Sequence, residues 1–152
     1  MALNTTGTIL TIRETSTAGT SLLPLYSARG LSHKMSYIDG AMVQEYTVNG
    51  ELVDLSLSRF RKLQLVISAN DVRPPSLDAC YPGREVIVEC ANVFSYPTIG
   101  GTPGRTPVSG SEFIEGDFTF YRPTITAILG QPSDGFEEWE AGHAWTLQMR
   151  EK

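Results

Sequence analysis

Cysteine, charge and long apolar runs are all scarce in this sequence of 152 residues. The two cysteines, Cys80 and Cys90, are too few for the disulfide framework of a small secreted domain. Charged residues make up 19% of the chain, below the usual share of about 25%, and the net charge is −5. No run of apolar residues approaches the roughly 20 that a membrane-spanning helix needs. General nucleic-acid binding and membrane association are therefore disfavoured, because neither a basic surface nor a spanning segment is expected.

The N-terminal residues contain no basic region followed by an apolar run, so we expect no signal peptide and synthesis in a cytoplasm. In that compartment both thiols are expected to be free. Cys90 follows the apolar residues Val86, Ile87 and Val88, which predicts that it packs in the core as a small hydrophobic residue.

Motifs that would indicate catalysis or metal binding are missing. His33 and His143 are far apart and neither has a metal-ligand spacing, which favours two ordinary histidines at the surface or at the rim of the core. Residues 100–106 are glycine-rich but lack the Gly-Lys-Ser/Thr ending of a phosphate loop. No Gly-x-Ser-x-Gly elbow is present. We therefore expect no enzyme, no catalytic residue, no metal and no cofactor.

Short strand-like segments recur along the chain, and no segment has a sustained helical period. Asn49-Gly50 separates two such segments and predicts a hairpin over residues 42–55 with a type I′ turn. The segments that we expect to form strands are residues 8–13, 21–26, 42–48, 51–55, 63–68, 86–90, 118–129 (broken at Pro123) and 144–149. This pattern predicts one mainly β domain over residues 1–152, a β-sandwich or a β-barrel-like fold.

Two segments depart from this strand pattern. Residues 55–63 are the only plausible helix, about two turns long, so the fold contains at most one short helix. Residues 97–107 hold three prolines and three glycines, which prevents a regular ladder. We expect a loop of about 15 residues there, longer than most loops in compact domains and hence functional or mobile.

Candidate contact residues come from three places. Pro103, Arg105 and Pro107 belong to the long loop, where the prolines reduce the entropy lost on ordering and Arg105 offers a donor to a partner's carboxylate. Phe136 and Trp139 lie among the acidic residues of the segment 134–140, an arrangement typical of protein contacts or of a solvated face. The remaining candidates are two arginines in the sequence's one basic cluster, Arg59 and Arg61.

Eight stretches of the sequence share features with one known family of proteins. They are YSARGL (26–31), TVNGELVDL (47–55), FRK (60–62), DVRPPSLD (71–78), YPG (81–83), GDFTFYRP (116–123), EWEAG (138–142) and WTL (145–147). In these stretches the chain resembles small virion proteins that tailed bacteriophages encode among their structural genes. The resemblance covers residues 26–151 and brings no catalytic residues. The family has an Asp-Glu-Trp-Gly stretch before its last strand. Here Glu137-Glu138-Trp139-Glu140 replaces it and the glycine is displaced to Gly142, which changes the local turn.

The resemblance implies a structural component of a tailed-phage virion, made in the host cytoplasm and assembled with other virion proteins and with copies of itself. We expect a tail or distal-tail protein that acts through protein–protein contacts as a homo-oligomer. A capsid decoration protein is an alternative within the same class. An alternative from another class is a carbohydrate-binding β-sandwich that uses Trp139, Phe136 or Tyr96 as stacking platforms.

Overall fold

The computed structural model describes residues 9–15, 21–22, 30–71 and 77–152. The second predicted strand, at residues 21–26, lies largely outside the described residues. Its first two residues are described and are not in a strand, although the amide of Leu22 donates to the carbonyl of Ile12 at 2.6 Å.

The main sheet contains seven antiparallel strands among the described residues. Its path is β1–β6–β10–β12–β5–β2, and β11 pairs with β12 beside this path. The strands are β1 (Thr11–Glu14), β2 (Ser32–Tyr37), β5 (Leu63–Asp71), β6 (Glu85–Glu89), β10 (Thr124–Leu129), β11 (Ser133–Glu137) and β12 (Gly142–Glu151).

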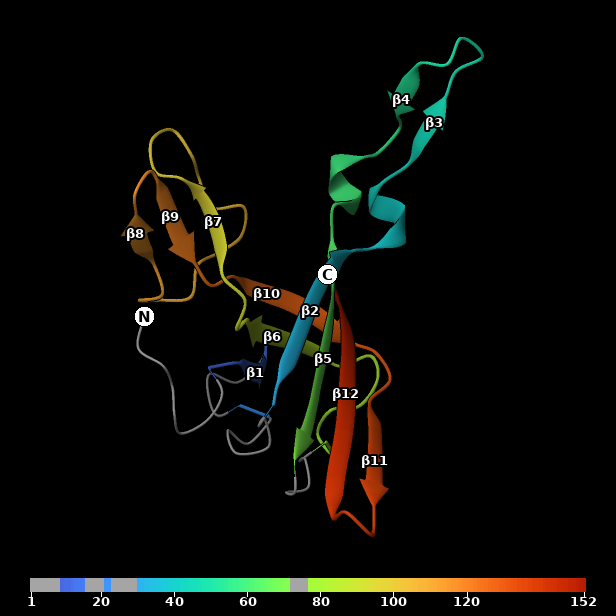
Figure 1. Ribbon diagram of the computed structural model, residues 1–152, viewed down its shortest axis with the longest axis vertical. Coiled ribbons are helices and arrows are strands. Elements are labelled where there is room, and N and C mark those ends of the chain that lie inside the picture. Colours follow the sequence, from blue (N-terminus) through green and yellow to red (C-terminus); the bar gives the residue numbers. More distant parts are fainter. Residues whose placement is uncertain (1–8, 16–20, 23–29, 72–76) are drawn as a thin grey trace.

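The sheet folds over itself because β12 has different neighbours along one edge. Its first half pairs with β11 over residues 142–146, and its last residues pair with β10 over residues 149–151. On its other edge it pairs with β5 over residues 143–150. Figure 1 shows β1, β6 and β10 running across the direction of β2, β5 and β12. These crossed layers enclose the core, as in orthogonally packed β proteins, and the predicted mainly β fold is confirmed.

Alternation along the strands supplies this core. Leu65 and Ile67 on β5, Val86 and Val88 on β6, and Leu147 on β12 are fully buried. Successive side chains of a strand point to opposite faces, so each strand places every second residue between the layers. Cys80 and Cys90 are also buried and both thiols are free. The core position predicted for Cys90 is therefore confirmed.

A second sheet extends from one end of the β6–β10 layer. It has the order β7–β9–β8, with β7 at Phe94–Pro97, β8 at Phe113–Glu115 and β9 at Phe118–Tyr121. Pro123 separates β9 from β10, as the sequence predicts, and its carbonyl accepts a hydrogen bond from the amide of Cys90 at 3.0 Å. The long loop expected near residues 97–110 is the connection between β7 and β8.

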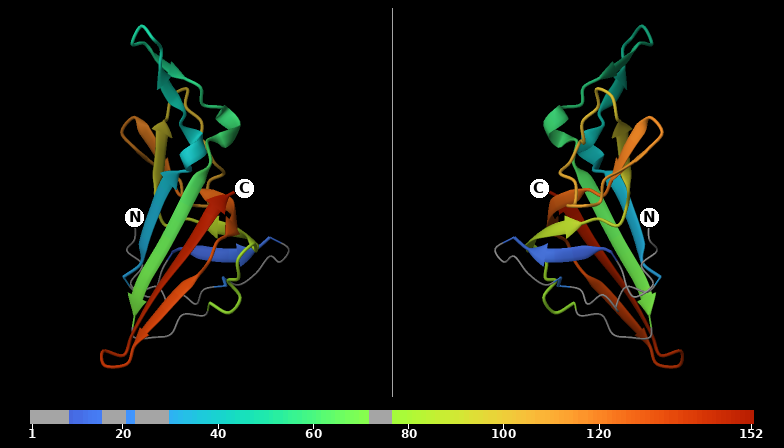
Figure 2. Two further views of the ribbon diagram at one scale, coloured as in Figure 1. Left: turned by 90° about the vertical axis from the view of Figure 1, so that its right-hand side faces the viewer. Right: turned by 90° about the vertical axis from the view of Figure 1, so that its left-hand side faces the viewer.

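Residues 38–62, which we call the arm, leave the main sheet between β2 and β5 and return to it. They contain β3 (Gln44–Tyr46), β4 (Leu52–Asp54) and two short 3₁₀ turns, η2 (Asp39–Ala41) and η3 (Ser58–Phe60). The amide of Ile38 donates to the carbonyl of Lys62 at 3.0 Å and closes the base of the arm. Figures 1 and 2 show the arm projecting from one end of the long axis of the molecule.

The predicted hairpin at residues 42–55 is confirmed, but the predicted turn type is wrong. Thr47 and Glu51 face each other around a loop of residues 48–50, closed by a hydrogen bond from the Gly50 amide to the Thr47 carbonyl at 2.9 Å. Gly50 has φ +80°, whereas Asn49 does not have a positive φ. A type I′ turn needs a positive φ at both residues, so the longer loop with one left-handed glycine replaces it.

The helix considered for residues 55–63 is absent from the described chain. The 3₁₀ turn η3 covers residues 58–60, and Leu63 already belongs to β5. A helix of two turns is marginal without a surface to pack on. This segment has no such surface, because Leu57 and Phe60 both face solvent.

Candidate interaction surfaces

The arm presents the largest group of exposed apolar side chains that lie on one segment of the described chain. Tyr46 is 75% exposed, Leu52 is 54% exposed and Val48 is fully exposed. The whole group is Met42, Val43, Tyr46, Val48, Leu52, Val53, Leu55, Leu57 and Phe60. Soluble monomers rarely expose large contiguous apolar patches, and an isolated two-stranded hairpin is marginally stable in water. These properties are typical of a contact surface.

The base of the arm carries the basic cluster. Arg59 and Arg61 are exposed, and the guanidinium of Arg59 lies 5.2 Å from the centre of the Phe60 ring. The hydrogen bonds from Ser56, followed by the nearby charge of Arg61, hold the pKa of Asp54 below its usual value. Arg61 therefore has one carboxylate of its own arm nearby, whereas the guanidinium of Arg59 forms no ion pair in the described part of the chain.

The structure gives Arg105 an intramolecular role that differs from the predicted one. Its Nε and Nη2 donate to the two carboxylate oxygens of Glu151 at 3.1 and 2.9 Å, and both side chains are largely buried. The hydrogen bonds to Glu151 hold the pKa of Arg105 above its usual value. Glu151 also accepts a hydrogen bond from the amide of Leu63 at 2.8 Å. Arg105 therefore pairs with a carboxylate of its own chain, whereas the sequence predicts a pairing with a partner's carboxylate.

The second half of the long loop is hydrogen-bonded to the start of β10 and bridged to Pro123. Pro107 forms a β-bridge with Pro123, and the amide of Thr124 donates to the carbonyl of Thr106 at 2.8 Å. Pro103 and Pro107 are both half-buried. Ile99, by contrast, is 93% exposed at the start of the loop. The second half of this loop is therefore attached to the body, and its first turn is the part open to solvent.

The β11–β12 hairpin holds the two aromatic candidates in different states. The ring of Phe136 packs on His143, with 4.6 Å between ring centres. Trp139 lies in the turn between the strands and is 99% exposed. The acidic residues around it, Glu137, Glu138 and Glu140, are exposed and form no ion pair in the described part of the chain. Phe136 is still 57% exposed, so both aromatic side chains are accessible, and Trp139 is the more exposed of the two.

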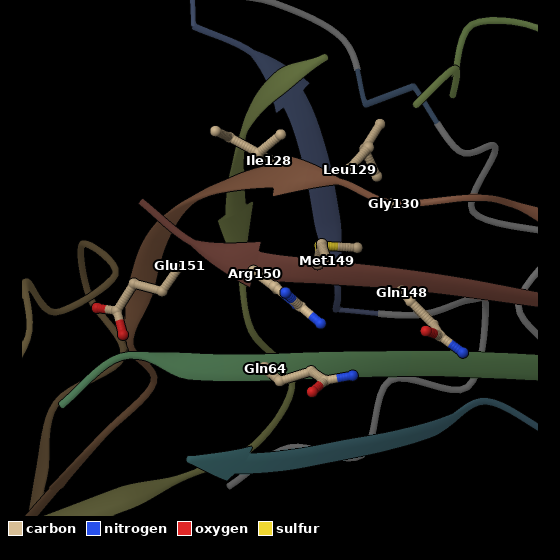
Figure 3. Close-up of a pocket in the computed structure, with 8 residues that line it drawn as sticks. All are labelled: Gln64, Ile128, Leu129, Gly130, Gln148, Met149, Arg150 and Glu151. Carbon is tan, nitrogen blue, oxygen red and sulfur yellow. The ribbon is translucent and has the colours of Figure 1, made fainter. Parts of the chain in front are cut away.

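Figure 3 shows a pocket of about 400 Å³ where β5, β10 and β12 meet. Its lining includes Gln64, Gln148 and Arg150, and its one carboxylate is Glu151. That carboxylate is already engaged by Arg105, so it is not available as a free acid or base. Among the described residues no group of three or more His, Cys, Asp and Glu side chains is placed to hold a metal ion.

In the portion of the chain that is described, no helix has the length and apolar character required to cross a membrane.

Another pocket lies at the base of the arm, around Tyr37, Ile38 and Met42. Sequence reasoning missed this region and the exposure of the arm. The alternation of apolar residues in the arm resembles that of a buried strand, and the sequence contains no signal that separates the two cases.

Of the seven predicted contact residues, the structure brings Arg61 close to Arg105, whose Nη2 donates to the Arg61 carbonyl at 3.4 Å. It places Phe136 and Trp139 at the opposite end of the molecule (Figure 1).

Comparison with protein-family models, with curated proteins and with solved structures gives no match to this chain.

Proposed function

We propose that this chain is a structural component of a tailed-phage virion, in the tail or its distal end, and that it acts through protein–protein contacts and not by catalysis. The observation that carries the assembly role is the arm, which exposes nine large apolar side chains outside the core of its own domain. The resemblance of residues 26–151 to small virion proteins supports the setting. The expected partners are other virion proteins and further copies of the chain.

The physical argument for assembly is the contrast between what the arm exposes and what it buries. Among residues 42–60 only Ser56 is even half-buried, so the arm contributes little to the core. Apolar surface removed from water contributes roughly 25 cal/mol per Å², and the arm can gain this stabilisation only from a neighbouring molecule. In a particle with many identical copies, modest contacts of this kind add up through multivalency.

The test is a triple variant of the arm, Tyr46→Ser/Val48→Ser/Leu52→Ser. We expect the isolated chain to fold normally, measured by circular dichroism and thermal melting, because these side chains lie outside the core. We expect its copy number in purified particles, measured by quantitative mass spectrometry after separation of heads from tails, to fall at least tenfold, as loss of hot-spot side chains predicts.

A matched variant controls for the general loss of exposed apolar surface. Ile99→Ser/Ile114→Ser/Phe118→Ser removes three exposed apolar side chains from the β7–β8–β9 region. It is expected to enter particles at the normal copy number. Normal incorporation of the arm variant would refute the role that we assign to the arm. Recovery of the wild-type chain with heads in hundreds of copies, and not with tails in tens, would favour the capsid decoration alternative.

One observation favours the carbohydrate-binding alternative, namely the full exposure of Trp139. The other two predicted platforms already contact a ring of the chain, since Phe136, although 57% exposed, packs on His143 and Tyr96 lies edge-to-face with Tyr121 at 5.8 Å. Trp145 is buried, so a change in tryptophan fluorescence on titration with soluble glycans would report on Trp139. A saturable change that is lost in Trp139→Ala would support this alternative.

A further inference from the structure

Two surfaces at opposite ends of the molecule complement one another. The first is the turn that joins β11 to β12, which we call the tip and which comprises residues 138–141. Trp139 projects from it with 99% of its side chain exposed, between Glu138 and Glu140. A fully exposed tryptophan is an unfavourable surface for a monomer and a common anchor in protein interfaces.

The second surface is a pocket of about 560 Å³ at the base of the arm. Its apolar lining comes from Tyr37, Ile38, Ala41 and Met42, and its polar lining from Asp39 and Arg61. This volume falls in the range of about 300–1,000 Å³ that is typical of binding pockets, and it exceeds what an indole ring occupies. Arg59 lies near this pocket in sequence and is also exposed.

The two surfaces match in chemistry. Apolar walls suit the body of an indole, and the carboxylate of Asp39 can accept a hydrogen bond from the indole N–H, which is a donor only. Arg59 and Arg61 are opposite in charge to the two glutamates that flank Trp139. Charge complementarity of this kind fixes the register of a contact and discriminates among partners.

A single chain cannot bring the two surfaces together. Figures 1 and 2 show the arm at one extremity of the long axis and the β11–β12 turn at the other. The tip is anchored to β12, which runs through the core, so the tip cannot fold back onto the base of the arm without unfolding the body. Contact between these surfaces therefore requires two molecules.

We propose that Trp139 of one copy inserts into the pocket at the base of the arm of the next copy, with Glu138 and Glu140 facing Arg59 and Arg61. This inference rests on the proposed assembly function and names one of its contacts. The contact is heterologous, because each copy uses a different surface on either side. Repetition therefore produces a ring if the rotation between copies closes, or an open filament if it does not.

The first experiment measures self-association of the purified full-length chain by sedimentation velocity over a concentration series. We expect the wild-type chain to form larger species as its concentration rises. Trp139→Ala is expected to weaken association by about thirtyfold, since it removes a buried aromatic anchor. Ile114→Ala removes an apolar side chain that is 67% exposed elsewhere and is the matched control, with no expected change.

The second experiment distinguishes this head-to-tail contact from any symmetric one. The double variant Met42→Asp/Arg61→Glu alters the pocket and keeps the tip, whereas Trp139→Ala alters the tip and keeps the pocket. At concentrations where neither variant self-associates, their mixture is expected to form dimers that do not grow further. A further test exchanges the charges of the two surfaces. Arg59→Glu/Arg61→Glu alone and Glu138→Arg/Glu140→Arg alone are each expected to abolish self-association. The chain that carries all four substitutions is expected to self-associate again.

Three results would overturn the inference. They are a wild-type chain that is monomeric up to its solubility limit, undiminished association of Trp139→Ala, and a mixture of the two single-surface variants that remains monomeric although both are folded by circular dichroism. None of these results bears on the proposed function, which is tested separately by the incorporation of the arm variant into particles. An arm that binds only other virion proteins would give the first of them together with failed incorporation of that variant.

Discussion

The body and the arm of this protein are built from similar sequence and end in opposite environments. On β5, Leu63, Leu65 and Ile67 alternate with half-buried residues and are 4%, 0% and 0% exposed. In the arm, Tyr46 and Val48 alternate with Thr47 in the same way, yet Tyr46 is 75% exposed and Val48 is fully exposed. Alternation predicts that a segment is a strand with one apolar face, but it does not say which molecule covers that face. In the body the chain covers it, and we propose that in the arm another molecule does.

The largest expected difference between these regions concerns a matched pair of leucines. Leu147 on β12 is fully buried, and Leu52 on β4 faces solvent. We expect Leu147→Ala to lower the free energy of unfolding by about 2–5 kcal/mol, because it leaves a cavity in a close-packed core. We expect Leu52→Ala to change it by less than about 0.5 kcal/mol. Urea denaturation of both variants measures the difference.

The comparison between body and arm would fail if both substitutions lowered the free energy of unfolding by similar amounts. A loss of several kcal/mol on Leu52→Ala would mean that the arm packs against the body in solution. The wild-type arm would then have no free apolar surface to offer to a partner.

Sequence reasoning predicted those parts of the fold that depend on local pattern. The buried alternation of β5, β6 and β12, the break at Pro123 and the hairpin around Gly50 all follow from residue type at fixed spacing. The strands β2, β7, β8 and β11 were missed, because β2 and β11 carry few apolar residues and β7 and β8 are very short. Such strands form through pairing with a neighbour, which is a tertiary effect.

The candidate surfaces were harder to predict, since contacts between distant residues decide them. Nothing in the sequence pairs Arg105 with Glu151, 46 positions away, yet that pairing determines whether Arg105 is available to a partner. Similarly, Phe136 and Trp139 are close in sequence, but only Phe136 finds a ring to pack on within the chain.

The second prediction compares two arginines, one from each region. Arg105→Ala breaks a largely buried ion pair with two hydrogen bonds and should cost about 2–3 kcal/mol in the free energy of unfolding. Arg59→Ala, in the arm, should cost less than about 0.5 kcal/mol, because surface charges contribute little. A double-mutant cycle of Arg105→Ala with Glu151→Ala should return a coupling energy of about 1 kcal/mol or more. A coupling near zero would show that the long loop is not attached to the body through this pair.

The third prediction is a pH dependence that belongs to the body. Burial lowers the pKa of His33 on β2 from 6.5 to about 4, and neither ring nitrogen has a hydrogen-bond partner among the described residues. Between these values the unfolded chain binds a proton that the folded chain does not. Stability should therefore be unaffected by this group above pH 6.5 and should fall as the pH drops towards 4.

Because the ring is only half-buried, we expect His33 to account for about 1–2 kcal/mol of lost stability between pH 7 and pH 5. Urea denaturation at the two pH values measures it. The variant His33→Gln should lose this part of the pH dependence, whereas His143→Gln should keep it. An unchanged pH dependence in His33→Gln would show that the ring is solvated in the folded protein.

The smallest expected effect compares the two hairpin turns, which both need one residue in the left-handed region. In the arm that residue is Gly50, with φ +80°, and at the tip it is Ala141, with φ +51°. Left-handed backbone costs a residue with a Cβ roughly 1 kcal/mol, so Ala141→Gly should raise the free energy of unfolding by up to about 1 kcal/mol. The gain should appear in global denaturation, because β12 continues from this turn into the core.

The control for this gain is Ala144→Gly, three residues further along β12. It should lower the free energy of unfolding by about 0.5–1 kcal/mol, since glycine weakens a strand without relieving strain. Gly50→Ala introduces the same strain into the arm, yet global denaturation should be unchanged and only hydrogen exchange at the Thr47 and Glu51 amides should accelerate. A global loss on Gly50→Ala equal to the gain on Ala141→Gly would mean that arm and body unfold as one cooperative unit.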